Sequence, residues 1–174
     1  MALLRGINLG PRNRVSMPEL RRRLTEAGYR DVHTLLQSGN VVAATPLSAA
    51  DLAAALQRQL RDWFGLELAV VVRSGEELGE VVARDPLGGQ VTDPRRYQVS
   101  FLASPLSGEV GERLRALAAG GERLALYDRE IYAWHPEGVA RSKLWNELAG
   151  PRLGTVATTR NWTTVTKLAE LARP

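Results

Sequence analysis

Two short polar segments near the C-terminal end combine cations with hydrogen-bonding side chains. Arg141, Ser142 and Lys143 stand at the start of one predicted helix, and Arg160 and Asn161 stand at the start of another. A helix N-terminus favours negative charge, and guanidinium or ammonium groups beside it would strengthen the binding of a phosphate. The alternative is that these residues only cap their helices, with the cations solvated.

The N-terminal part contains a second group of polar residues. Arg5 interrupts an apolar strand, and Asn8 follows near the end of that strand. The segment Gln37-Ser38-Gly39-Asn40 separates two strands, and its backbone N–H groups could hold an anion because glycine permits positive φ. The alternative roles are an ion pair or loop contact for Arg5 and turn formation for the others. The candidate ligand-binding residues are Arg5, Asn8, Gln37, Ser38, Asn40, Arg141, Ser142, Lys143, Arg160 and Asn161.

Several other kinds of site lack the residues they require. The chain has no cysteine, which excludes a disulfide framework, a thiolate zinc site and a cysteine nucleophile. Its two histidines, His33 and His135, are too few for a histidine-rich metal site. Ser38 has no base within reach, and Lys143 would need burial to act as a Schiff-base nucleophile. Glycine-rich nucleotide, nucleophile-elbow, zincin and EF-hand motifs are absent, so no metal or cofactor is expected and no reaction is indicated.

Charge is concentrated at the two ends of the 174-residue chain. Residues 1–40 carry seven basic and three acidic side chains, residues 41–137 carry ten and fourteen, and residues 138–174 carry six and two. If the ends meet, they form one basic surface, which would raise the local concentration of anions. The alternative is an ordinary solvated face.

Hydrophobic periodicity predicts the same order of elements in both halves. The first half has predicted strands at 2–7, 32–36, 41–44 and 68–72, and helices at 16–28, 48–64 and 76–83. The second half has predicted strands at 97–103, 123–126, 130–134 and 153–158, and helices at 106–119, 141–148 and 162–172. Each half therefore reads β-α-β-β-α-β followed by a helix, the split βαβ order of ferredoxin-like folds. The fold class is α+β, with predicted domains at 1–85 and 96–174 and a linker at 86–95.

This topology decides which loops share an edge of a sheet. The end of the first strand and the hairpin between the second and third lie at one edge, which groups Arg5 and Asn8 with residues 37–40. The ends of the third and fourth strands lie at the opposite edge, which in the second half groups residues 141–143 with residues 158–162. Loops held by a rigid scaffold are the usual place for binding residues.

Four aromatic side chains alternate on two neighbouring predicted strands. Tyr97, Phe101, Tyr132 and Trp134 would share one face of the second sheet. RNA-recognition modules stack bases on aromatic residues of the corresponding strands. The other face has a weaker apolar pattern, so we expect the aromatic face to pack in the core or between the halves. Trp162 is also expected to anchor the core.

Several segments resemble one bacterial family. They are A-L-L-R-G-I-N-L-G, L-Q-S-G-N-V-V, V-V-V-R-S, R-S-K-L and T-T-R-N-W-T-T-V-T-K-L. Together they resemble the family called domain of unknown function 1697, from residue 2 to about residue 171. Pro11-Arg12 departs from that pattern, which more often has glycine followed by a basic or small residue. The resemblance implies an α+β protein with two ferredoxin-like halves, and it implies no activity.

The expected function is the binding of a small anionic, phosphate-bearing ligand at the basic loops. A nucleic-acid-binding protein is one alternative, drawn from an isoelectric point near 9.9 and the ferredoxin-like topology. A protein-interaction module that uses its sheet edges or aromatic face is another. The apolar runs are too short to span a bilayer and no signal peptide is recognisable, so no membrane partner and a cytoplasmic location are expected. The oligomeric state is left open.

Overall fold

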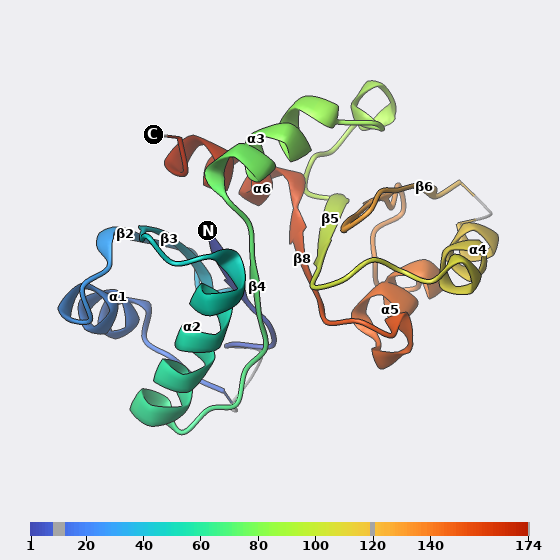
Figure 1. The fold of residues 1–174 in the computed structure, drawn as a ribbon. Helices are drawn as coiled ribbons and strands as arrows, with labels where there is room; N and C mark the ends of the chain where they lie inside the picture. The colour runs from blue at the N-terminus through green and yellow to red at the C-terminus, as the bar shows by residue number, and fades with distance from the viewer. Residues whose placement is uncertain (9–12, 119–120, 174) are drawn as a thin grey trace. The chain divides into compact units, whose positions relative to one another are not determined.

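Each half of the chain forms a four-stranded antiparallel sheet with the predicted ferredoxin-like strand order (Figure 1). The structure is a computed structural model that describes residues 1–8, 13–118 and 121–173. The strand orders are β2-β3-β1-β4 and β6-β7-β5-β8, which are the same order shifted by four strands. In both sheets the first and third strands are adjacent and antiparallel. The predicted α+β class and the repeated halves are confirmed.

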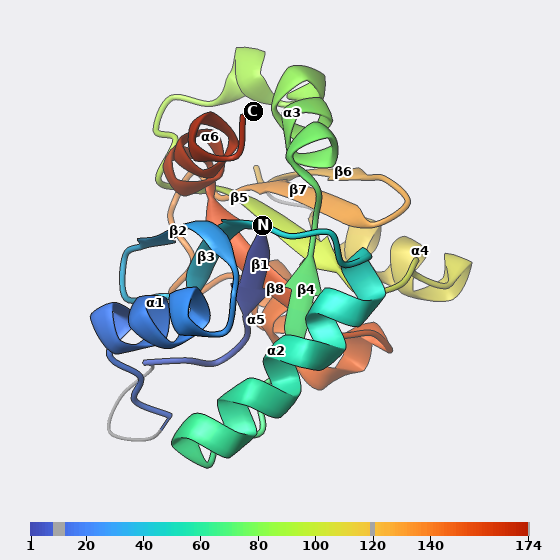
Figure 2. The same ribbon diagram turned by 60° about the vertical axis from the view of Figure 1, so that its left-hand side comes forward.

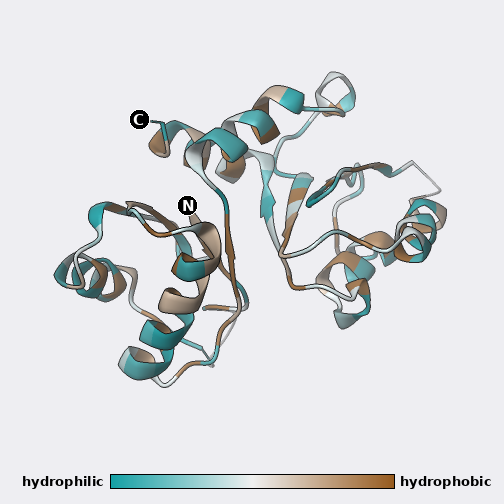
Figure 3. Ribbon diagram, viewed as in Figure 1, coloured by the Kyte–Doolittle hydropathy of each residue, from teal (hydrophilic) through white to brown (hydrophobic). Residues whose placement is uncertain are grey.

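The first sheet is covered on one face by two helices, α1 and α2 (Figure 2). Its elements are β1 (Ala2–Leu4), α1 (Met17–Glu26), β2 (Arg30–Leu35), β3 (Asn40–Ala44), α2 (Ala49–Phe64) and β4 (Val70–Val72), followed by α3 (Gly75–Arg84). Apolar side chains of α1 and α2, spaced one turn apart, pack on those of β1, β3 and β4 to form a core. Figure 3 shows the result as a hydrophobic β4 and a banded α2.

Local capping explains where these helices begin and end. Ser16 caps α1 by accepting a hydrogen bond from the Glu19 amide. Ser48 caps α2 in the same way. Gly65 ends α2 in the left-handed conformation with φ of 66°, where glycine has no steric penalty.

The second sheet repeats this arrangement with α4 and α5. Its elements are β5 (Tyr97–Leu102), α4 (Gly108–Leu117), β6 (Arg123–Leu126), β7 (Glu130–Trp134), α5 (Lys143–Ala149), β8 (Ala157–Asn161) and α6 (Trp162–Leu171). Short 3-10 turns cover Gly88–Gln90 and Pro151–Leu153. The last strand begins four residues later and ends three residues later than the predicted 153–158. Pro151 opens a 3-10 turn and Gly154 ends it at φ 72°, so the chain cannot enter the sheet before that point.

The aromatic face of the second sheet is buried. Tyr97, Phe101 and Tyr132 have no exposed surface and Trp134 has 6%. The ring of Trp162 in α6 stacks on Tyr97 with centroids 4.9 Å apart, and the Tyr132 hydroxyl donates to the Val81 carbonyl at 2.9 Å. Burial raises the pKa of Tyr132 to about 12. The predicted packing role of these rings is confirmed.

The opposite face of this sheet also forms a core, contrary to its weaker apolar pattern. Leu102, Ile131 and Ala133 pack there against Leu114 of α4 and Leu144 of α5, among other apolar side chains. Leucine side chains of α4 and α5 thus complete a core on this face.

The chain divides into two compact units, Met1–Gly79 with Leu168–Pro174, and Glu80–Lys167. The divisions fall inside α3 and inside α6 rather than in a loop. Compactness does not measure independent folding, so the domains at 1–85 and 96–174 with a linker at 86–95 stay a prediction. Among the described residues, no helix has the length and apolar character needed to cross a bilayer.

Candidate functional site

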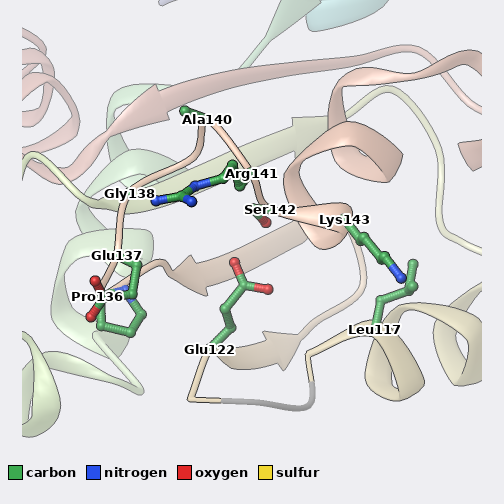
Figure 4. Close-up of a pocket in the computed structure, with 9 residues that line it drawn as sticks. All are labelled: Leu117, Glu122, Pro136, Glu137, Gly138, Ala140, Arg141, Ser142 and Lys143. Atoms are coloured by element: carbon green, nitrogen blue, oxygen red, sulfur yellow. The ribbon is translucent and has the colours of Figure 1, made fainter.

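A cavity of about 490 Å³ lies beside the loop that joins β7 to α5 (Figure 4). Three sequence-predicted residues line it: Arg141, Ser142 and Lys143. Its other lining residues are Leu117, Glu122, Pro136, Glu137, Gly138 and Ala140. The volume is in the range of known small-molecule sites. Three of the nine lining residues were therefore candidates from the sequence, and the other six were not.

The shape of the cavity wall next to α5 follows from the chain after β7. The Gly138 amide donates to the His135 carbonyl at 2.8 Å in a turn where Gly138 adopts φ of 80°. The Ser142 amide then donates to the Val139 carbonyl, and the Ser142 hydroxyl accepts from the Trp145 amide at 2.8 Å. Ser142 is thus the N-cap of α5, which begins at Lys143, two residues later than the predicted start at residue 141.

A buried histidine that does not line the cavity contacts the lining carboxylate of Glu122. Glu122 Oε1 lies 2.5 Å from Nδ1 of His135, and the His135 side chain has no exposed surface. The Ser142 hydroxyl lies 3.3 Å from the same nitrogen. Because both neighbours contact Nδ1, the three groups do not form the serine–histidine–carboxylate relay, which uses both ring nitrogens.

The sequence contains a signal for this pair in the register of the predicted hairpin. In the register of the β6–β7 hairpin, Arg123 lies opposite Trp134, so Glu122 and His135 are the next residues outward. Both strands of this hairpin were predicted, and extending them by one residue would have placed the carboxylate beside the imidazole.

The two cations of the cavity are exposed. Arg141 and Lys143 both reach solvent, and in Figure 4 the Glu122 carboxylate lies between them and points toward Ser142. Lys143 lacks the burial that a Schiff-base lysine requires. Its ammonium group is a solvated point charge at the edge of the cavity.

Arg160 and Asn161 are not among the residues that line this cavity. Arg160 donates to the Thr158 hydroxyl and to the Thr159 carbonyl, both at 2.8 Å, and burial lowers its pKa to about 10. Asn161 accepts from the amide and the hydroxyl of Thr164 in the first turn of α6. These contacts match the alternative, structural interpretation of Asn161 as a cap.

In the first unit, the side chains of Asn8 and Asn40 form hydrogen bonds that connect neighbouring loop segments. Asn8 donates to the carbonyls of Val15 and Gln37 and accepts from the Val15 amide, so its amide group joins two loops. Asn40 is fully buried and donates to the Leu35 carbonyl and the Ser38 hydroxyl. The predicted grouping of these loops at one edge is therefore present, with their side chains engaged in structural hydrogen bonds.

The remaining first-unit candidates have different surroundings. Gln37 and Asn8 line a hollow of about 460 Å³ together with Arg14, Val15 and Ser16. The Arg5 amide donates to the Ala69 carbonyl, and its side chain is half-buried. Five of the ten candidate residues lie in each unit. Within residues 1–8, 13–118 and 121–173, no group of three or more acidic, histidine or cysteine side chains is placed to hold a metal ion.

The fold defines an α+β protein of two ferredoxin-like units, and the cavity of about 490 Å³ lies in the second of them. The model of a family of unknown function, DUF1697, matches residues 1–132, and the chain belongs to this family, as its resemblance predicted. A solved structure of a conserved bacterial protein from Streptococcus pneumoniae is similar, with 23% identity and a TM-score of 0.77 over 99% of this chain and 97% of that one. This likeness shows the fold alone. Comparison with curated proteins found no match.

Proposed function

We propose that the second unit binds a small ligand with an anionic, phosphate-like group in the cavity beside α5. The observation that supports this proposal is that Arg141 and Lys143 both line a cavity of about 490 Å³. A guanidinium fork and an ammonium group recognise phosphate oxygens in complementary ways. The apolar lining from Leu117 and Pro136 suits a carbon skeleton.

The position of Lys143 opposes the stability of its own helix. Lys143 is the first residue of α5, and the first turn of α5 contains no acidic residue. A cation at a helix N-terminus interacts unfavourably with the backbone dipoles. We therefore expect Lys143→Gln to stabilise the unliganded protein by about 0.3–1 kcal/mol, measured by urea unfolding. A loss of stability would contradict this electrostatic argument.

The test of the proposal is ligand-dependent thermal stability. The panel contains inorganic phosphate, sugar phosphates, nucleotides and short RNA. A ligand at 100 times its dissociation constant adds about 2.7 kcal/mol, which corresponds to a shift of about 5–10 °C for a chain of this length. We expect a small phosphate compound to produce such a shift in the wild type, and Lys143→Gln and Arg141→Gln to reduce it strongly.

Arg58→Gln is the matched control because it removes one exposed positive charge from α2, at a residue that does not line the cavity. An equal loss of binding in this control would indicate general charge attraction. If no small phosphate compound shifts the wild type, the proposal is wrong.

The alternatives have less support. Burial of Tyr97, Phe101 and Tyr132 removes the stacking surface on which the RNA interpretation relied, and leaves only the basic composition. Short RNA in the panel tests whether the basic composition alone binds nucleic acid, because such binding weakens steeply as the salt concentration rises.

A protein-interaction role would draw on exposed apolar residues such as Leu36, which is 61% exposed. The cytoplasm stays the expected location.

A further inference from the structure

We propose that Glu122, held in place by His135, is the specificity-determining residue of this cavity and selects ligands that carry hydrogen-bond donors next to their anionic group. The inference rests on the proposed function, since it assumes that Arg141 and Lys143 bind the anionic end. It names the ligand class more narrowly: a phosphate monoester with a hydroxyl or ammonium group on a short carbon skeleton.

Glu122 is a carboxylate with little access to solvent. Its side chain is 16% exposed, and it lines the cavity. Removing a carboxylate from water is costly unless it gains hydrogen bonds or an opposite charge. Its one hydrogen-bond partner within the described part of the chain is His135, which contacts Oε1. The carboxylate therefore retains acceptor capacity on the side of the cavity.

His135 is suited to orient this carboxylate. The imidazole has no exposed surface, and its ring packs edge-on against Trp145 with centroids 6.0 Å apart. A carboxylate oxygen only accepts, so we assign the proton to Nδ1 in the 2.5 Å contact with Glu122. Because the ring cannot reach solvent, it fixes Oε1 and leaves the rest of the carboxylate facing the cavity. His135 is thus a positioning residue.

The charges along the cavity determine the ligand chemistry. Arg141 and Lys143 attract an anionic group, whereas Glu122 accepts hydrogen bonds and repels a second anion. A ligand that carries a hydrogen-bond donor next to its phosphate satisfies both. A bare inorganic phosphate uses only the cations, and a diphosphate places negative charge against the carboxylate.

The experiment compares three probes by isothermal titration calorimetry: inorganic phosphate, glycerol 3-phosphate and O-phosphoethanolamine. A hydrogen bond to a charged group contributes enough for about a tenfold or greater preference. We expect the wild type to prefer at least one of the two monoesters over inorganic phosphate by about that factor. The glycerol and ethanolamine probes separate hydroxyl from ammonium recognition.

Glu122→Gln is the first variant because it keeps the shape and an oxygen that can accept from His135. We expect it to reduce the preference to within about threefold while leaving the affinity for inorganic phosphate unchanged or higher, because a negative charge is removed. Glu137→Gln is the matched control, since Glu137 is an exposed carboxylate that lines the same cavity. We expect it to keep the preference.

Two substitutions of His135 test the positioning role. His135→Asn keeps a side-chain N–H near the position of Nδ1, whereas His135→Phe keeps a ring and loses the donor. We expect the asparagine variant to retain the preference for monoesters and the phenylalanine variant to lose it, both with inorganic phosphate still bound. A general structural role would lower the affinity for all probes together.

The outcomes separate the two proposals. If inorganic phosphate binds through Lys143 but no monoester is preferred, or if Glu137→Gln has the same effect as Glu122→Gln, the inference is overturned and the proposed function stands. If no probe binds, both are overturned.

Discussion

Gly39→Ala is expected to destabilise the protein by about 2–5 kcal/mol. The left-handed backbone conformation costs an L-residue about 1–2 kcal/mol, and forcing an additional methyl group into a packed interior costs about 1–3 kcal/mol. Gly39 has φ of +73°, and a Cβ there would lie 2.4 Å from Ile7 Cγ2 and 2.8 Å from Leu4 Cβ. Both penalties therefore apply at this one residue.

The neighbours of Gly39 cannot move away easily. Leu4 and Ile7 are each 2% exposed, and the Leu4 amide donates to the Gly39 carbonyl at 2.8 Å. The hairpin between β2 and β3 thus lies directly on the end of β1. Any shift that makes room for a methyl group would also lengthen this hydrogen bond.

Gly65→Ala is the control that measures the energetic cost of the left-handed backbone conformation alone. Gly65 has φ of +66° and no atom within 4 Å of the position that a Cβ would take. We expect a loss of only about 1–2 kcal/mol there. Urea unfolding of both variants measures the difference. Equal losses at the two glycines would show that the contact with Leu4 and Ile7 contributes nothing.

The role of Gly39 illustrates how far the sequence could predict this site. A glycine between two strands predicts a turn with positive φ, and that prediction is correct. The sequence does not show whether the freed space is filled by a ligand or by the protein itself. In the structure Ile7 and Leu4 fill it, and the side chain of Asn40 bonds the Leu35 carbonyl.

The fold was more predictable than the site because it depends on local and repeated signals. Serine caps before α1 and α2, and apolar residues one turn apart, are visible in the sequence. The order of elements then limits the topology, since split βαβ units place the third strand between the first two. The last strand was misplaced because its start depends on where the 3-10 turn at Pro151 ends.

The cavity was less predictable because its walls come from distant segments. Arg141 and Lys143 were found from their charge and their place before a helix. Glu122 and His135 are separated by thirteen residues and meet only because the β6–β7 hairpin brings them together. Composition and helix periodicity carry no information about such a pair, whereas strand register does.

Glu147→Gln is expected to destabilise the protein by about 2–3 kcal/mol at neutral pH, the order expected for hydrogen bonds between charged groups in a buried position. The side chain of Glu147 is 3% exposed. One carboxylate oxygen accepts from Nε of Arg113 in α4 at 3.1 Å, and the other accepts from Arg152 at 2.6 Å. This carboxylate therefore ties α5 to α4 and to the 3-10 turn that follows α5.

This contribution should disappear in acid. The hydrogen bonds from Arg152, supported by Arg113, hold the pKa of Glu147 below its ordinary value of 4.5. The unfolded chain therefore takes up the proton at a higher pH than the folded protein does. The stabilisation is fully present above about pH 4.5 and is lost as the pH falls through the lower, folded-state pKa. Urea unfolding of wild type and variant between pH 7 and pH 3 should show the two curves converging in acid.

Glu19→Gln is the control for this argument. Glu19 is also held by two arginines, Arg22 and Arg23, which lower its pKa to about 2. Its side chain is 32% exposed on the surface of α1, where solvent replaces the lost contacts. Glu19→Gln should therefore lower the free energy of unfolding much less than Glu147→Gln does. An equal loss at both residues would show that burial of Glu147 adds nothing. A larger loss at Glu147, accompanied by weaker phosphate binding, would show that the anchoring of α5 also positions Lys143.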